Sequence, residues 1–198
     1  ATVLAGGVAA DIALDERHGG RVGDEDRSPL GRRLIPADDR VGHFHTVPQD
    51  FTSDRPMSPY RRYIARWQLD KADPQAKLSP PKQPIVFWLE NTIPLEYRDW
   101  VKEGVLLWNK AFERIGFRDA IVVKQQPDDA DWDPADTRYS SVRWFTGVDA
   151  TFAIGPSRAN PFTGQIYDAD IGFSEALTRT FRRQAEELIG PTVPEPQR

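Results

Sequence analysis

The side chains that could carry chemistry are few, and most of them stand alone in the sequence. All three histidines lie in the first quarter of the chain: His18, His43 and His45. His43 and His45 would share one face of a short strand predicted over 41–47, an arrangement by which some metal sites present two imidazoles. A pair of half-exposed strand residues is the simpler interpretation, and His18, as a lone histidine, sets no metal geometry.

Two aspartates are the other candidates. Asp168 and Asp170 alternate along a strand predicted over 165–173, so they share a face and lie close enough to influence each other's ionisation. Acid–base chemistry by this pair, helped by the arginines of segment 60–67, is one hypothesis, and an ordinary polar strand face is the other. The chain has no H-E-x-x-H, P-loop, G-x-G-x-x-G or G-x-S-x-G motif. Its lack of cysteine excludes thiolate catalysis, disulfides and Cys-ligated zinc.

The elements that would position these residues are organised around segment 84–117. Ile85–Leu89 is an unbroken apolar run typical of a strand buried on both faces. Pro94 suits the first position of a helix, and Gly116 suits its end. Apolar residues at spacings of three and four predict one long helix over 94–115, with this stripe: Tyr97, Val101, Val105, Trp108, Phe112 and Ile115. With a second apolar run at 120–123, the segment predicts a βαβ unit.

Further strands are predicted over 62–69, 138–145, 151–154 and 165–173. A last helix is predicted over 174–189, with Ser174 as its N-cap. Its apolar stripe consists of Leu177, Phe181, Ala185 and Leu188. Residues 1–40 are predicted to form an irregular N-terminal arm, because they are rich in charge, Gly and Pro after a short apolar start. The expected fold class is therefore α+β: a twisted mixed sheet with a long backing helix within residues 41–198.

Composition narrows the functional classes. The net charge of the 198 residues is −4, and 39% of them are hydrophobic and 28% charged. Acidic and basic residues are interspersed, so nothing indicates a nucleic-acid or anionic-membrane partner. No run of about 20 apolar residues predicts a membrane span.

Four linked sequences carry a family resemblance. They are PIVFWLENTIP, VKEGVLLWNKAFERIGF, QPDDADWDPADTRYSSVRW and AIGPSRANPFTGQIYDADI. Together they resemble a family of large bacterial zinc-dependent metalloproteases, which are exported and metzincin-like and include domains of unknown function. The resemblance covers roughly residues 38–189. It implies that the protein is exported to the periplasm, the outer membrane or the extracellular space.

The resemblance also implies a fold and a site. The chain would be the upper, N-terminal subdomain of a zincin domain, in which segment 151–157 forms an antiparallel edge strand lining the cleft. This strand would pair with an extended peptide substrate through its backbone. The implied substrate-binding residues are Phe152, Ala153, Ile154, Gly155, Pro156 and Ser157. Segment 164–173 would return beneath the edge strand.

The family's zinc ligands and general base lie on a later helix with the pattern H-E-x-x-H-x-x-G-x-x-H, which this sequence lacks. Asp168 and Asp170 match the family's acidic strand, but they are not zinc ligands there. We therefore expect no cofactor in this chain, and zinc in a longer parent. The first hypothesis is that the chain is a fragment of such a protease, which supplies the scaffold and the edge strand but is inert alone. Its partner would be the missing catalytic half.

Two alternatives stay open. The chain could be a complete non-catalytic domain that binds a peptide or a partner through the same edge, or a small enzyme that uses Asp168 and Asp170. The fragment hypothesis has a further consequence, because a missing half would leave the apolar stripe of the last helix uncovered. We therefore expect self-association.

Overall fold

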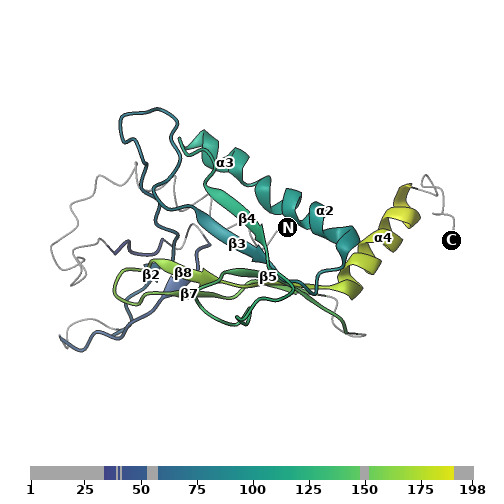
Figure 1. Cartoon of the computed structure of the whole chain (residues 1–198). Helices are drawn as coiled ribbons and strands as arrows, with labels where there is room; N and C mark the ends of the chain where they lie inside the picture. The colour runs from purple at the N-terminus through teal and green to yellow at the C-terminus, as the bar shows by residue number, and fades with distance from the viewer. Residues whose placement is uncertain (1–33, 39, 41, 53–57, 148–151, 190–198) are drawn as a thin grey trace.

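The computed structural model describes residues 34–38, 40, 42–52, 58–147 and 152–189 (Figure 1). Most of the predicted N-terminal arm therefore lies outside the described residues, as do His18 and Thr151. Among the described residues no helix is both long enough and apolar enough to cross a membrane.

The centre of the fold is a five-stranded mixed sheet. Its strands are β3 (Ile85–Leu89), β4 (Ile121–Gln125), β5 (Ser141–Phe145), β6 (Ala153–Ile154) and β9 (Ile171–Ser174). Their order across the sheet is β4-β3-β5-β9-β6. The first four strands in this order are parallel, and β6 pairs antiparallel with β9 at one edge. This arrangement confirms the predicted α+β class and the βαβ unit.

The backing helix is divided into α2 (Leu95–Leu106) and α3 (Asn109–Arg114), where the sequence predicts one helix over 94–115. Pro94 precedes α2 with an extended ψ of 139°. Between the helices, Leu107 and Trp108 keep right-handed helical angles, but Lys110 N and Ala111 N donate to carbonyls only three residues back. The helical path is therefore continuous, with a local tightening of its hydrogen bonds.

The core lies between the sheet and these helices (Figure 1). Ile85, Phe87 and Leu89 are buried on the helix side, against Val105 and Phe112. Val86 and Trp88 point to the other face and are only half-buried, so the predicted burial of β3 on both faces is incomplete. Two rings from loop 126–140 cover Trp88: Trp132, with centroids 5.4 Å apart, and Tyr139, with centroids 5.9 Å apart.

Two short ribbons flank the sheet. β1 (His45–Thr46) pairs with β2 (Tyr63–Ile64), and β7 (Ser157–Ala159) pairs with β8 (Ile166–Ala169). The strand predicted over 62–69 is thus limited to two residues, followed by an isolated bridge at Arg66. Ile64, one of these two strand residues, is buried.

The strand predicted over 165–173 is divided between two sheets. Asp170 separates β8 from β9, because its N–H donates to the carbonyl of Pro156 instead of continuing a single ladder. The peptide of Pro156, just after β6, therefore fixes where β8 ends and β9 begins.

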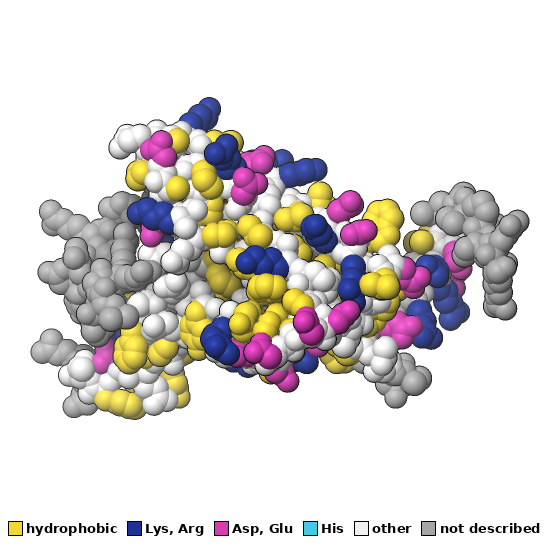
Figure 2. Space-filling view, in the orientation of Figure 1, with side chains coloured by type: hydrophobic (Ala, Val, Ile, Leu, Met, Phe, Trp, Pro, Cys, Tyr) yellow, Lys and Arg dark blue, Asp and Glu magenta, His cyan; other side chains and the backbone are white. Residues whose placement is uncertain are grey.

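Helix α4 (Glu175–Ile189) follows β9 directly and extends away from the rest of the fold (Figure 1). Ser174 Oγ accepts a hydrogen bond from Ala176 N at 3.2 Å, which confirms its role as the N-cap. Leu177 is half-buried, whereas Phe181 and Leu188 are exposed. In Figure 2 acidic and basic side chains lie side by side along this helix, as its ion pairs Arg179–Glu175 and Arg183–Glu187 require.

Candidate functional site

The edge strand β6 is the first component of the candidate site. Ala153 lies opposite Phe173, and Ile154 lies opposite Gly172. Among the described residues no strand pairs with the outer side of β6. In an antiparallel ladder, alternate residues of an edge strand direct their N–H and C=O groups away from the sheet. These groups can accept one more strand.

A small apolar surface accompanies this edge. Phe152 and Ile154 are two residues apart and share a face, with exposed fractions of 51% and 49%. The ring of Phe145, on β5, lies with its centroid 5.9 Å from that of Phe152. We call Phe145, Phe152 and Ile154 the edge patch.

Gly172 lies beneath the edge patch, on the strand between its members. A Cβ at this position would lie 2.9 Å from Phe145 Cε1 and 3.2 Å from Ile154 Cγ1. Side chains from β5 and β6 thus approach each other over the bare backbone of β9. The glycine is what makes the edge patch continuous.

The predicted substrate-binding residues divide into two groups. Phe152, Ala153 and Ile154 lie together on the open edge. Gly155 and Pro156 end β6, and Ser157 begins β7, where it pairs with Ala169 of β8. The edge strand is therefore shorter than the predicted segment 151–157. Peptide binding by these residues stays a prediction.

The two predicted aspartates hold the β7–β8 ribbon in place. Arg158 on β7 forms an ion pair with Asp168 and lies 3.6 Å from Asp170 Oδ2. Asp170 Oδ1 accepts a hydrogen bond from Ser141 Oγ at 2.7 Å. Burial raises the pKa of Asp168, while the hydrogen bond from Arg158 opposes this rise. These contacts connect the ribbon to the start of β5.

This environment argues against the hypothesis of a small enzyme. The side chain of Asp168 is 1% exposed, so a substrate cannot reach its carboxylate. The cation beside it is Arg158, which sequence reasoning did not single out. The sequence does offer a signal for it. Arg158 stands between small residues just before a turn, and a residue at such a position faces the returning strand of a hairpin.

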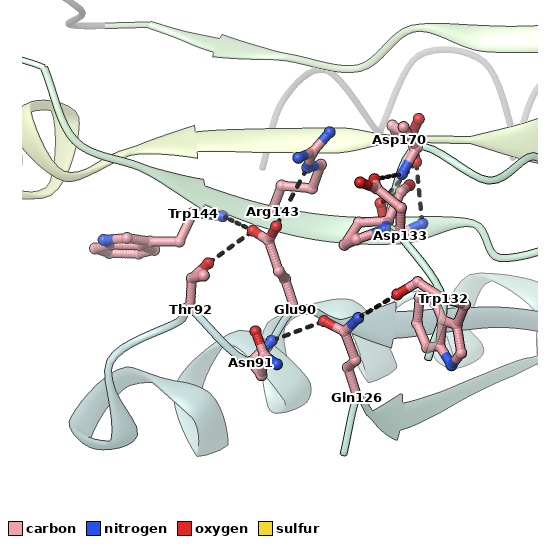
Figure 3. A network of polar contacts seen from close by, with 12 residues as sticks. Glu90, Asn91, Thr92, Gln126, Trp132, Asp133, Arg143, Trp144 and Asp170 are labelled. Carbon is pink, nitrogen blue, oxygen red and sulfur yellow. Dashed lines mark hydrogen bonds and ion pairs between the residues drawn. The ribbon is translucent and has the colours of Figure 1, made fainter. Parts of the chain in front are cut away.

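A second polar network lies at the carboxyl ends of β3 and β5 (Figure 3). Glu90 is buried, and its Oε2 accepts hydrogen bonds from Thr92 Oγ1 at 2.8 Å and Trp144 N at 3.2 Å. Its Oε1 lies 3.5 Å from Arg143 Nε. Glu90 was also missed by the sequence analysis, although a carboxylate directly after a buried apolar strand is a recognisable signal.

Gln126 extends this network along the same end of the sheet. Its Oε1 accepts from Asn91 N at 3.1 Å, and its Nε2 donates to the carbonyl of Trp132 at 3.3 Å (Figure 3). Loop 126–140 is thereby fixed to the turn after β3. Side-chain hydrogen bonds thus connect the loop and the turn that follow the carboxyl ends of the central strands.

The two histidines of the predicted strand 41–47 differ in their exposure to solvent. His43 is buried, and its pKa is lowered first by burial and then by the neighbouring His45, which is exposed. No group of three or more His, Cys, Asp or Glu side chains with metal-binding geometry occurs in the described part of the chain.

The chain matches no family model, no curated protein and no solved structure.

Proposed function

We propose that this chain is the scaffold half of a zinc-dependent metallopeptidase domain and that β6 binds the extended peptide substrate. The observation that carries the proposal is the position of β6, an antiparallel strand at the open edge of an otherwise parallel sheet. The order of elements also supports it. A strand, a backing helix and further strands precede β6, and the family resemblance implies an antiparallel edge strand in this segment.

Binding would occur by addition of a strand. The peptide would hydrogen-bond to the outward N–H and C=O groups around Ala153 and Ile154, while Gly155 and Pro156 limit the paired length. The backbone would supply affinity, and side chains on alternate positions would supply selectivity. The exposed edge makes this possible without rearrangement of the described core.

The catalytic groups would come from elsewhere in the parent protein. The resemblance places zinc and the general base on a later helix, which would supply a metal-activated water for peptide hydrolysis. The purified chain should therefore bind no stoichiometric zinc and cleave no peptide. We also propose, from the resemblance, that the parent is exported, which fractionation of the source cells would check.

Backbone pairing can be tested directly. We would titrate the ¹⁵N-labelled chain with acetyl-Thr-Leu-Thr-Leu-Thr-amide and follow amide shifts by NMR. The control is the same peptide with N-methyl groups at alternate positions, which removes the donors on one peptide edge. We expect shifts at residues 152–154 and 171–173 with the first peptide and much smaller ones with the second. Equal shifts with both peptides, or none with either, would contradict the proposal.

The assignment to a protease needs a separate test. Zinc content by mass spectrometry and cleavage of casein should both be negative for the purified chain. The reading frame beyond Arg198 should encode H-E-x-x-H-x-x-G-x-x-H. Stoichiometric zinc together with peptidase activity in the purified chain would overturn the view that it is an inert half.

A non-catalytic binding domain is the second candidate. It is favoured by the completeness of the core, in which Phe87, Phe112 and Val142 are buried by elements of this chain. A sheet edge backed by its own core can bind a peptide without a second half. A stop codon directly after Arg198, together with a positive NMR titration, would make this the leading function.

A further inference from the structure

The edge patch has a definite orientation relative to a peptide bound at β6. Because Phe152 and Ile154 share one face, an added strand would place every second side chain beside them. The Cβ atoms of such cross-strand neighbours are about 4.5–5.5 Å apart. Every second side chain of the bound peptide would therefore contact Phe152 or Ile154.

The register of the sheet extends this surface inward. Ile154 lies opposite Gly172, and Gly172 lies opposite Arg143, so the three residues form one row across β6, β9 and β5. Since Gly172 has no side chain, Phe145 and Ile154 meet above it. A peptide side chain at the edge would meet Phe152 and Ile154, which the ring of Phe145 supports from the inner side of the sheet.

The charges on this face favour an uncharged occupant. Arg143 is the charged member of the row, and its Nε lies 3.5 Å from Glu90 Oε1. This partner neutralises the guanidinium, so the row offers no unpaired charge to a charged peptide side chain. Placing a charge against Phe152 and Ile154 would remove water from it without a compensating partner.

From these observations we infer that the edge patch is a specificity subsite, which selects peptides with an aliphatic or aromatic side chain at the position facing Phe152 and Ile154. This inference rests on the proposed function, because it takes strand addition at β6 as the binding mode. It adds the chemical class of the residue that the site prefers.

The test compares acetyl-Thr-Xaa-Thr-Xaa-Thr-amide peptides in which Xaa is Leu, Ser, Glu or Lys. NMR titration gives the dissociation constant of each. We expect the Leu peptide to bind about tenfold more tightly than the Ser peptide, as expected for partial burial of a leucine side chain. The Glu and Lys peptides should bind no better than the Ser peptide.

Two variants then test whether the edge patch is the source of the preference for leucine over serine. Phe152→Ser should reduce the advantage of Leu over Ser to about twofold or less. The matched control is Phe162→Ser, since Phe162 is 60% exposed in the turn between β7 and β8 and lies outside the edge patch. This control should keep the full preference. The amide spectra of both variants report whether they are folded.

The outcomes separate the two proposals. If no peptide shifts the amides of β6, the proposed function fails. If the peptides shift β6 but the Leu and Ser forms bind equally, strand addition stands and the specificity inference is wrong. A leucine preference that survives Phe152→Ser would also overturn the inference, since the peptide would then present its leucines to the opposite face of the sheet.

Discussion

Arg158 and Asp168 form an ion pair across the β7–β8 ribbon in which the two partners differ greatly in exposure. The side chain of Asp168 is 1% exposed, whereas that of Arg158 is 49% exposed. The free-energy cost of removing water from the pair therefore arises mainly at the aspartate. The second oxygen of this side chain, Oδ1, is buried without a hydrogen-bond partner in the described structure.

Asp168→Asn should alter the pH dependence of stability in a specific direction. Burial raises the pKa of Asp168 above 3.8, with Asp170 adding to the rise and Arg158 opposing it. A carboxyl group with a raised pKa binds protons more tightly in the folded state, so its contribution to stability is present at low pH and is lost as pH rises through the raised pKa. The measurement is urea unfolding of both proteins at a series of pH values.

The quantity to compare is the free energy of unfolding of the wild type minus that of Asp168→Asn. We expect this difference to decrease as pH rises from about 3 to about 7. A difference that increases with pH would mean that Arg158 outweighs burial at this site.

Asp136 should titrate at unusually low pH. Its hydrogen bonds with the side chain and backbone N–H of Arg138 lower its pKa to about 2. A lowered pKa means a contribution to stability that is present above 3.8 and lost as pH falls toward 2. Carboxyl ¹³C NMR should find the low value in the wild type and a value closer to 3.8 in Arg138→Ala.

Gly172→Ala should destabilise the fold, whereas Gly104→Ala should stabilise it. The new Cβ at 172 would lie 2.9 Å from Phe145 Cε1, and overpacking of this kind costs about 1–3 kcal/mol. Gly104 lies within α2 with nothing within 4 Å of an added Cβ, so alanine there should add about 0.5–1 kcal/mol. Urea unfolding measures both effects. If Gly172→Ala were as stable as the wild type, Phe145 and Ile154 would have to move aside without cost.

Phe112→Ala should show how far the core depends on the backing helix. Phe112 is 2% exposed between α3 and the sheet, and loss of a buried phenylalanine ring costs about 3–5 kcal/mol. Phe162→Ala removes the same ring from an exposed turn and should change the free energy of unfolding by less than about 0.5 kcal/mol. Similar effects for the two substitutions would contradict the described core.

Self-association through α4 can be tested with one substitution. Phe181 and Leu188 leave an apolar stripe in solvent, and exposed apolar surface favours association. Sedimentation of the wild type should therefore depend on concentration, and Leu188→Glu should weaken that dependence. Leu95→Glu changes a similarly exposed leucine on α2 and should leave the concentration dependence unchanged. A wild type that stays monomeric at high concentration would refute the prediction.

The local sequence determined the elements whose signal lies within their own residues. The apolar run Ile85–Leu89 is β3 with its predicted bounds, and the three-and-four spacing up to Ile115 gave the backing helix. Ser174 was identifiable as a cap because an N-cap bonds to an N–H only two residues away. Short-range periodicity and capping are properties of neighbouring residues, so one sequence suffices for them.

The tertiary structure decided which distant residues meet. The row Ile154–Gly172–Arg143, the contact of Glu90 with Trp144 and the ion pair of Arg158 with Asp168 all depend on strand order and register. The same is true of the break at Asp170, which bonds to the carbonyl of Pro156. Local pattern does not encode these contacts, because the alternation of a strand fixes which of its side chains share a face but not which strand comes to lie beside it.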